Sequence, residues 1–284
     1  MIGWLITNAF VDVPLFDEHF DMLTAAASEQ KITLIHKTNA ELLLGVPTVP
    51  DFALFWDKDM KLAKMLEQIG LKLFNSVSAI EVCDDKSLTY LKLLDTVKMP
   101  ETYIAPKTYE LVGYGNYSFL DPIAGRLGLP LVIKGCFGSF GMQVYLAENI
   151  SQMREIVKRM GIKPMIFQKY IKSSHGRDMR VYVVGGKIKA AMIRRSLDGD
   201  FRSNVTNGGT ADPVMPSPAY AEMAITACER LELDFGGVDI LFGENDEPVL
   251  CEVNSNAHFK ALCECTGTDI AGEIITHIRY VLTK

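Results

Sequence analysis

The 284-residue sequence lacks the marks of several protein classes. It has no apolar run near the ~18 residues that can cross a bilayer and no basic, apolar leader at its start. It has no excess of positive charge, because 29 Lys and Arg stand against 35 Asp and Glu, for a net charge of −6. Nucleic acid, whose phosphates attract basic surfaces, is therefore not the expected partner. We expect a cytoplasmic protein without membrane or nucleic-acid partners.

Several short cysteine and glycine motifs are also missing. The six cysteines include no Cys-x-x-Cys pair, and Cys263-Glu264-Cys265 has the wrong spacing for a common zinc knuckle. Six cysteines in a chain of this length do not make a disulfide framework, so we expect reduced thiols. No GxGxxG follows the first apolar stretch, and no Gly-Lys-Ser/Thr closes a Walker loop. These absences exclude the common dinucleotide and P-loop fingerprints.

What is present is an alternation of strands and helices in the first 80 residues. Three apolar stretches predict strands, one helix is predicted between the first two, and an amphipathic helix is predicted after the third. Such alternation is typical of a small parallel sheet covered on both faces. The predicted strands are 2–7, 31–36 and 51–56, and the predicted helices are 15–30 and 58–69.

The rest of the chain predicts two further units. The first runs from a helix between Asp84 and Val97 to a strand at 165–168, with a glycine-rich loop at 135–141. The second opens with a hairpin around Gly185-Gly186, a strong hairpin signal between two alternating stretches. It continues with a polar loop at 198–213, a helix at 217–230, two acid-bearing strands and a closing helix at 269–282.

The two acid-bearing strands carry the clearest chemical signal. Glu252 and Asn254 flank the β-branched Val253, so on a strand both side chains leave the same face. A hairpin across the polar turn 243–247 brings Asp239 beside them. Two carboxylates and an amide that converge repel one another unless a hard cation lies between them. Mg²⁺, which prefers oxygen ligands and substrate phosphates, is the expected ion.

Two upstream segments are compatible with nucleotide binding. Lys134 ends an apolar strand before the glycine-rich loop, where backbone N–H groups and a lysine can hold phosphate. A plain hairpin turn explains this loop equally well. The segment 168–171 can offer backbone groups to an adenine edge, although an ordinary strand leaving the core is the simpler interpretation.

A basic group follows in the third unit. Arg194, Arg195 and Arg202 lie on or just after the hairpin, and the planar arginine fork suits phosphate and carboxylate oxygens. A solvated surface is the alternative. Asp178 and Arg180 are two apart on a strand, and they are either a structural ion pair or nucleotide contacts. His258 lies four residues past Asn254, at the mouth of the expected site.

Taken in order, these parts resemble the ATP-grasp superfamily, and specifically the RimK-like carboxylate–amine ligases, which include glutamate ligases. The resemblance covers about residues 84–284. The matching stretches are Asp85-Lys86, Lys134 with its loop, 168–172, Asp178-Met179-Arg180, Arg194-Arg195, 199–204 with Gly208-Gly209, 237–241 and Glu252-Val253-Asn254.

The resemblance implies an α/β fold in which two α+β lobes clamp ATP behind a small parallel α/β domain. The implied units are 1–80, 81–168 and 169–284. The implied ATP contacts are Lys86 and Lys134 for the phosphates, Gln168, Lys169, Tyr170 and Ile171 for the adenine, Asp178 for positioning, and Arg202, Ser203 and Asn204 at the γ-phosphate and acyl group. Arg202 and Lys134 are the implied catalytic residues, and Asp239, Glu252 and Asn254 the implied ligands of two Mg²⁺ ions, with Mn²⁺ as an alternative.

The implied activity is amide formation through an acylphosphate, with glutamate as the best single choice of amine. The acceptor carboxylate belongs to a peptide, a carrier protein or a metabolite. Two places depart from the family pattern: Asn207 stands where many relatives have arginine, and 255–260 replaces a small residue followed by Pro-Gly. The implied substrate-side residues are Arg194, Arg195, Asn207, Ser255, Asn256 and His258.

Other readings stay open at this point. One is a non-catalytic ATP-binding module that regulates or scaffolds a partner. Another is phosphoryl transfer without ligation. Assembly into a homo-oligomer is also open.

Overall fold

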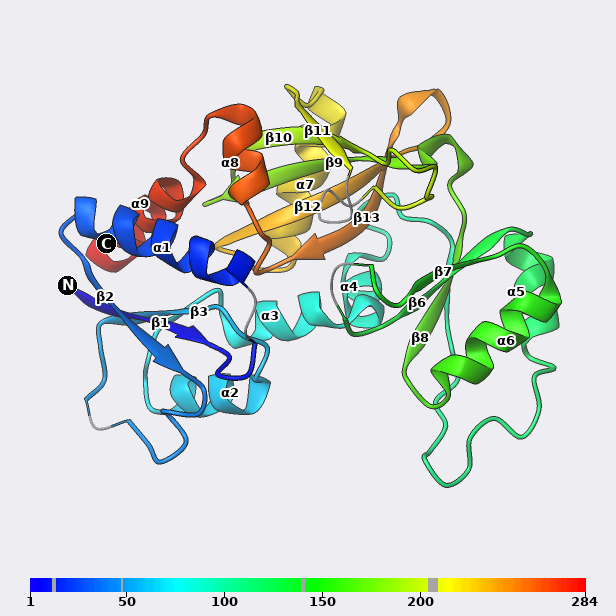
Figure 1. Cartoon of the computed structure of the whole chain (residues 1–284), viewed down its shortest axis with the longest axis horizontal. Helices are drawn as coiled ribbons and strands as arrows, with labels where there is room; N and C mark the ends of the chain where they lie inside the picture. Colours follow the sequence, from blue (N-terminus) through cyan, green and yellow to red (C-terminus); the bar gives the residue numbers. More distant parts are fainter. Residues whose placement is uncertain (12–13, 47, 139–140, 204–208) are drawn as a thin grey trace.

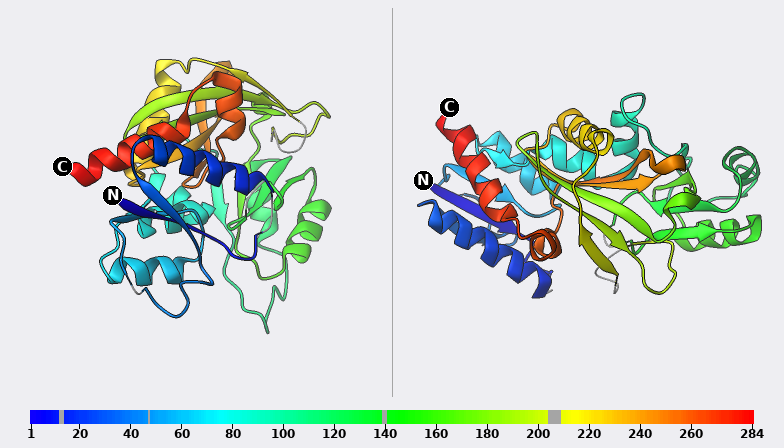
Figure 2. Two further views of the ribbon diagram at one scale, coloured as in Figure 1. Left: turned by 60° about the vertical axis from the view of Figure 1, so that its left-hand side comes forward. Right: turned by 90° about the horizontal axis from the view of Figure 1, so that it is seen from above.

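The computed structural model describes residues 1–11, 14–46, 48–138, 141–203 and 209–284. The described strands form three sheets. The first sheet and the middle sheet lie at opposite ends of the molecule, and the third sheet lies between them (Figures 1 and 2). The predicted mixed α/β fold is confirmed.

The first sheet is parallel and has the strand order β2-β1-β3-β4. Leu5 and Leu54 face the layer that contains α1, whereas Ile6 and Phe55 face the layer that contains α2. Both faces are therefore covered, as the strand–helix alternation predicts. The elements are β1 (Ile2–Thr7), α1 (Pro14–Glu29), β2 (Thr33–Thr38), β3 (Phe52–Phe55), α2 (Met60–Gln68), β4 (Leu73–Phe74) and α3 (Val77–Asp84).

The middle sheet is antiparallel, with the strand order β5-β8-β6-β7. Apolar residues of α5 and α6 pack with the inward side chains of this sheet in one cluster. Helix α4 connects this unit to the front domain and begins at Asp85, whose carboxylate caps Ser87 N–H at 2.8 Å. The elements are α4 (Lys86–Leu93), β5 (Thr102–Ile104), α5 (Leu120–Leu127), β6 (Leu131–Gly135), β7 (Val144–Ala147), α6 (Ile150–Met160) and β8 (Met165–Lys169).

The third sheet has the order β11-β10-β9-β12-β13 and is antiparallel throughout. The hairpin predicted around Gly185-Gly186 is the β9–β10 turn, and both glycines have positive φ. Helix α7 covers one face of the sheet. The elements are η1 (Lys172–Ser174), β9 (Arg177–Val184), β10 (Lys187–Arg195), β11 (Thr210–Pro213), α7 (Pro218–Arg230), β12 (Phe235–Phe242), η3 (Glu244–Asp246), β13 (Pro248–Asn254), α8 (Lys260–Thr266) and α9 (Ile270–Thr283).

The front domain and the C-terminal part share a core. Ile274 and Ile278 of α9 join Leu5 and Leu23 in one buried cluster. Asn75, fully buried, donates to the carbonyls of Phe235 and Ser255 and accepts from the N–H groups of Asp234 and Phe235. An amide with all these bonds made fixes the front domain against the third sheet. The limits of the three predicted units stay a prediction.

Some local expectations were wrong or incomplete. The helix expected to reach Val97 ends at Leu93, and the end of the loop expected at 198–213 is the strand β11. The elements α3, β4, β5, α5 and α8 were not predicted. All six cysteines lie in the described part of the chain and are free thiols, as expected. Among the described residues, no helix is long and apolar enough to span a membrane.

Candidate active site

The strands β12 and β13 bring the predicted metal ligands together. Asp239 lies directly opposite Glu252 in this antiparallel pair, and Asn254 lies opposite Gly237. Directly opposed residues project to the same face, and Asn254 follows Glu252 by two, so the three side chains share one face. Gly237 has room for no side chain, because a Cβ there would lie 2.5 Å from that of Ala257. The predicted hairpin geometry is confirmed at the level of the backbone.

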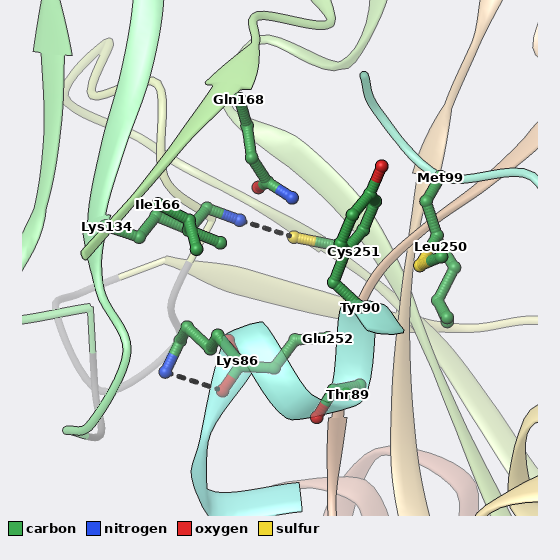
Figure 3. A pocket seen from close by; sticks show the side chains of 10 residues that line it. All are labelled: Lys86, Thr89, Tyr90, Met99, Lys134, Ile166, Gln168, Leu250, Cys251 and Glu252. Atoms are coloured by element: carbon green, nitrogen blue, oxygen red, sulfur yellow. Dashed lines mark hydrogen bonds and ion pairs between the residues drawn. The ribbon is translucent and has the colours of Figure 1, made fainter. Parts of the chain in front are cut away.

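A pocket lies where α4, the middle sheet and β13 meet (Figure 3). Lys86 and Lys134 both line it. Lys86 Nζ lies 3.5 Å from Glu252 Oε1 and donates to the Gly138 carbonyl at 3.1 Å. The remaining walls are largely apolar. The lining residues are Lys86, Thr89, Tyr90, Met99, Lys134, Ile166, Gln168, Leu250, Cys251 and Glu252.

Lys134 is only 7% exposed. Its Nζ contacts Cys251 Sγ at 3.6 Å. Burial raises the pKa of the Cys251 thiol, which therefore stays neutral at pH 7. In the described part of the chain, no carboxylate lies within ion-pair distance of Lys134. A buried ammonium without a counter-charge is costly and favours an anionic ligand.

The segment predicted to hold adenine contributes one side chain to this pocket. Gln168 is buried, and its Nε2 donates to Thr102 Oγ1 at 2.9 Å. The Thr102 hydroxyl donates its hydrogen to the Pro100 carbonyl, so it can act only as an acceptor toward Gln168. The amide orientation of Gln168 is therefore fixed. Lys169 is exposed, whereas Tyr170 and Ile171 are half-buried just past β8, and Tyr170 Oη bonds His175 Nδ1.

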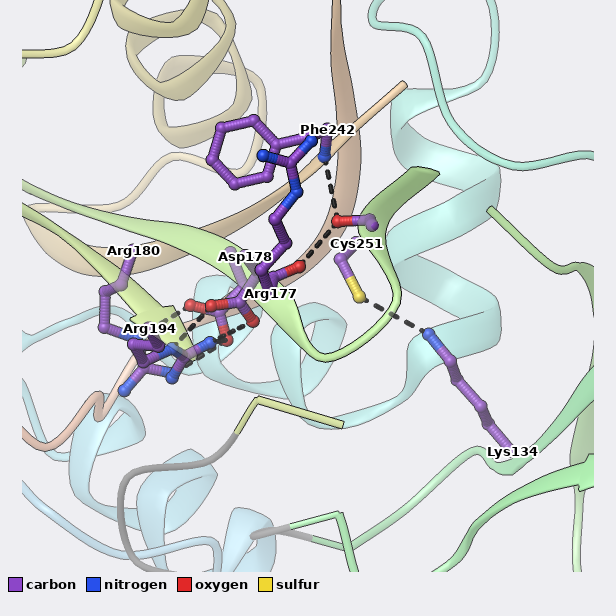
Figure 4. Close-up of polar contacts among 9 residues, drawn as sticks. Lys134, Arg177, Asp178, Arg180, Arg194, Phe242 and Cys251 are labelled. Atoms are coloured by element: carbon purple, nitrogen blue, oxygen red, sulfur yellow. Dashed lines mark hydrogen bonds and ion pairs between the residues drawn. The ribbon is translucent and has the colours of Figure 1, made fainter. Parts of the chain in front are cut away.

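Four charged side chains form a compact ion-pair cluster beside the pocket (Figure 4). Arg180 holds both oxygens of Asp239 at 2.7 Å. Arg194, which is 4% exposed, holds Asp178 at 2.7 and 2.5 Å and reaches Asp239 at 3.1 Å. Burial raises the pKa of Asp239, but the two guanidinium groups outweigh it and bring that pKa to about 2. We call these four residues the buried ion-pair cluster.

The cluster bears on two alternatives that the sequence left open. Asp178 and Arg194 form a structural ion pair with each other, rather than Asp178 with Arg180. Arg194 does not lie on a solvated surface, because burial is nearly complete. Arg195, the next residue, projects to the other face, is exposed and pairs with Asp212. Direct contact of Asp178 with nucleotide, and of Arg194 or Arg195 with substrate, stays a prediction.

Arg202 lies in the loop after β10. It binds Asp200 through Nη2 at 2.6 Å and donates through Nη1 to the Gly141 carbonyl at 3.0 Å. The hydrogen bond from Arg202 lowers the pKa of Asp200, so this pair is ionised at neutral pH. The arginine loop thus touches the end of the glycine-rich loop. Ser203 is buried beside it, and the predicted contacts Asn204 and Asn207 lie outside the described residues.

The residues after β13 meet the front domain. Ser255 is buried, and its carbonyl accepts from Asn75. Asn256 Nδ2 donates to the carbonyls of Phe55 and Asp57, each at 3.4 Å. Burial and the nearby charge of Arg180 lower the pKa of His258 to about 4, so its ring is neutral at pH 7. The segment after β13 therefore joins this strand to the front domain.

The donor set fits a magnesium ion in its chemistry. Asp239, Glu252 and Asn254 offer oxygen atoms on one face, as Mg²⁺ prefers. No cluster of three or more His, Cys, Asp or Glu side chains suited to a metal occurs in the described residues, and the set here has two carboxylates and an amide. Glu252 and Asp239 already contact Lys86 and Arg180. A cation at this place shares the two carboxylates with these basic groups.

Cys251 is a pocket residue that the sequence pattern did not indicate. Strict alternation places residue 251 on the face opposite Glu252. A β-bulge between Asp239 and Ile240 breaks the register at this point. Both Cys251 and Glu252 consequently line the pocket.

Comparisons with known proteins agree with this geometry. The chain is 42% identical over 221 residues to a probable alpha-L-glutamate ligase of Marinomonas sp. (strain MWYL1), covering 76% of this chain and 69% of that protein. It is 32% identical over 236 residues to N-acetylaspartylglutamate synthase A of Homo sapiens, covering 82% of this chain and 59% of that protein. The matched region is thus less than two thirds of the length of the human relative.

Solved structures show the same fold. A RimK domain ATP-grasp protein from Sphaerobacter thermophilus superposes with a TM-score of 0.75 at 20% identity, over 98% of this chain and 99% of that one. The ATP-grasp ligase PsnB, solved with a minimal precursor, Mg and ADP, superposes with a TM-score of 0.72 at 14% identity, over 100% of this chain and 97% of that one. Residues 83–278 match the family described as the RimK-like ATP-grasp domain. The chain belongs to the RimK-like ATP-grasp family.

Proposed function

We propose that this protein is an ATP-dependent carboxylate–amine ligase that forms an amide bond through an acylphosphate. Glutamate is the amine substrate that the relatives' names favour, since one is called a probable alpha-L-glutamate ligase and another N-acetylaspartylglutamate synthase A. The acceptor is a peptide, a carrier protein or a small metabolite with a free carboxylate.

The observation that carries this proposal is the charge arrangement of the pocket. The buried Lys134 ammonium lacks an anionic partner in the described residues, and Lys86 lines the same pocket. Glu252 also lines it, and Asp239 lies directly opposite Glu252 on β12. A nucleoside triphosphate with a divalent cation complements both features. Its phosphates would pair with the lysines, and the carboxylates would bind its cation.

The position of each site residue indicates its role in the proposed reaction. The apolar walls and the fixed amide of Gln168 hold the base, and Lys134 and Lys86 hold the phosphates. Arg202, which already contacts the glycine-rich loop, neutralises charge that builds on phosphoryl and acyl oxygens. Asp239, Glu252 and Asn254 would hold two Mg²⁺ ions, or Mn²⁺ in their place, which would supply Lewis-acid stabilisation of the phosphoryl group. The protein excludes water, which would hydrolyse the acylphosphate.

A non-catalytic ATP-binding module is the rival function. It is favoured by the engagement of both metal-site carboxylates with basic side chains of the protein itself. The two functions differ in turnover. The module binds ATP without consuming it, whereas the ligase forms one ADP for each amide bond.

The test is ADP release by the purified chain with ATP and Mg²⁺, in the presence of pooled amino acids and a panel of carboxylates. Mass spectrometry of the mixture identifies the amide product. The matched control is Glu252→Gln, which keeps the size of the side chain and removes its charge. ATP binding with no ADP release on any substrate pair supports the module. Phosphorylation of a hydroxyl without a new amide supports simple phosphoryl transfer.

A further inference from the structure

The front domain has a topological switch point that no site described so far uses. From β1 the chain passes through α1 to β2 on one side, and then returns to β3 on the other side of β1. In open parallel sheets, ligands bind outside the carboxyl ends of the strands at such a switch. The residues at this place are Asn8, just past β1, and Asp57, two residues past the end of β3.

Asp57 has the character of a ligand-binding carboxylate. It is 8% exposed, and it accepts hydrogen bonds from Lys58 N–H at 2.7 Å and from Asn8 Nδ2 at 3.2 and 3.4 Å. Burial raises its pKa, and these two neutral donors only partly offset that effect. Within the described ranges, no basic side chain forms an ion pair with it. Asp239, equally buried, has two arginines.

The switch point lies next to the segment that carries the metal-site ligands. Asn256, two residues after Asn254, donates to the carbonyl of Asp57 itself. Lys58, the residue after Asp57, forms an ion pair with Asp84. Asp84 lies two residues before Lys86, which lines the nucleotide pocket. Asp57 is therefore tied to the loop beyond the metal-site strand and to the helix that holds a phosphate-binding lysine.

We propose that Asp57, oriented by Asn8, binds the ammonium group of the amino-acid substrate. The inference rests on the proposed ligase function, because that reaction requires an amine. An ammonium group provides the positive charge and the N–H donors that a buried, unpaired carboxylate lacks.

The experiment compares Asp57→Asn with the matched control Asp59→Asn. Asp59 is two residues away and caps α2 by accepting from Leu62 N–H, a role that asparagine also fills. The probes are the twenty amino acids, with L-glutamate first, and glutarate, which lacks only the ammonium of glutamate. Binding is measured by calorimetry in the presence of Mg²⁺ and a non-hydrolysable ATP analogue, and KM values are measured wherever turnover occurs.

Asp57→Asn is expected to weaken binding of the amino acid by about 10- to 100-fold, the loss of one hydrogen bond to a charged group. It should leave the KM for ATP and the weak binding of glutarate unchanged. Its thermal midpoint should equal or exceed that of the unaltered chain, because the variant removes an uncompensated buried charge. Asn8→Ala should weaken binding in the same direction by a smaller factor.

Each result decides a separate point. Turnover with an unchanged amino-acid KM in Asp57→Asn overturns the inference and leaves the ligase proposal standing. Amino-acid binding that depends on Asp57, without turnover on any carboxylate, overturns the ligase proposal and leaves the binding site standing. If no amino acid binds the unaltered chain, both are wrong. A fall in the thermal midpoint of Asp57→Asn makes the carboxylate a structural element and overturns the inference.

Discussion

Replacing Asp239 by asparagine tests the buried ion-pair cluster directly. The cluster contains two carboxylates and two guanidinium groups, so its charges balance. The substitution leaves one positive charge uncompensated beside a carboxamide that cannot satisfy two arginines. Breaking a buried pair in this way costs about 3–5 kcal/mol. We expect Asp239→Asn to lower the free energy of unfolding by that amount at pH 7.

The same residue predicts a pH dependence. The pKa of Asp239 is held at about 2 in the folded chain, below its ordinary value of 3.8. The unfolded chain therefore takes up this proton at a higher pH than the folded chain does. The stabilisation is fully present above about pH 4 and is lost as the pH falls through 2. A shift of this size corresponds to about 2–3 kcal/mol.

Urea unfolding followed by circular dichroism at several pH values between 2 and 7 measures both effects. The matched control is Asp212→Asn on β11, where an exposed pair with Arg195 is worth at most about 1 kcal/mol. The unaltered chain and the control should lose stability between pH 4 and 2, and Asp239→Asn should lose less. If Asp239→Asn unfolds at the same urea concentration as the control at pH 7, the cluster does not stabilise the fold as argued.

Three further substitutions test the site. Glu252→Gln should abolish ADP formation. It should leave the circular dichroism spectrum unchanged, because Glu252 is half-buried and its ion pair with Lys86 is a single 3.5 Å contact. Near-normal activity would remove Glu252 from the metal site. Arg202→Ala should reduce the rate by about 10²–10³, as expected for a lost oxyanion-stabilising donor; an unchanged kcat would assign Arg202 to loop structure through its bonds to Asp200. Gln168→Leu should raise the KM for ATP by up to about 10-fold through loss of a polar contact in an apolar pocket; an unchanged KM would mean that backbone groups alone recognise the base.

Sequence periodicity predicted the hairpins and the parallel front sheet because these depend on local patterns. The pairing of Asp239 with Glu252 followed from the turn between their strands, and the register confirms it. The short elements β5 and α5 were missed. β5 has only three residues, and its hydrogen bonds go to β8, more than sixty residues away. A three-residue strand that depends on such a distant partner shows little periodicity in its own sequence.

The side-chain pairing could not be predicted from the sequence. Arg194 and Arg195 are adjacent and chemically alike, yet one is buried against Asp178 and the other is exposed beside Asp212. The alternation of a strand predicts opposite faces for them, but not which face is covered. Cys251 entered the pocket through a bulge, which breaks the alternation on which the prediction depends.

Two buried charges that have no counter-ion among the described residues connect the folding problem to the proposed reaction. Lys134 and Asp57 lie in different units and have opposite signs, and each is more than nine-tenths buried. A chain optimised for stability alone would replace both residues, because burying each charge costs desolvation free energy that no ion pair offsets. Their signs match the two kinds of group that a carboxylate–amine ligase must bring together, a triphosphate and an ammonium. Removing the charge of Asp57 should therefore leave the fold as stable as before or more so, and weaken amino-acid binding while ATP binding stays the same.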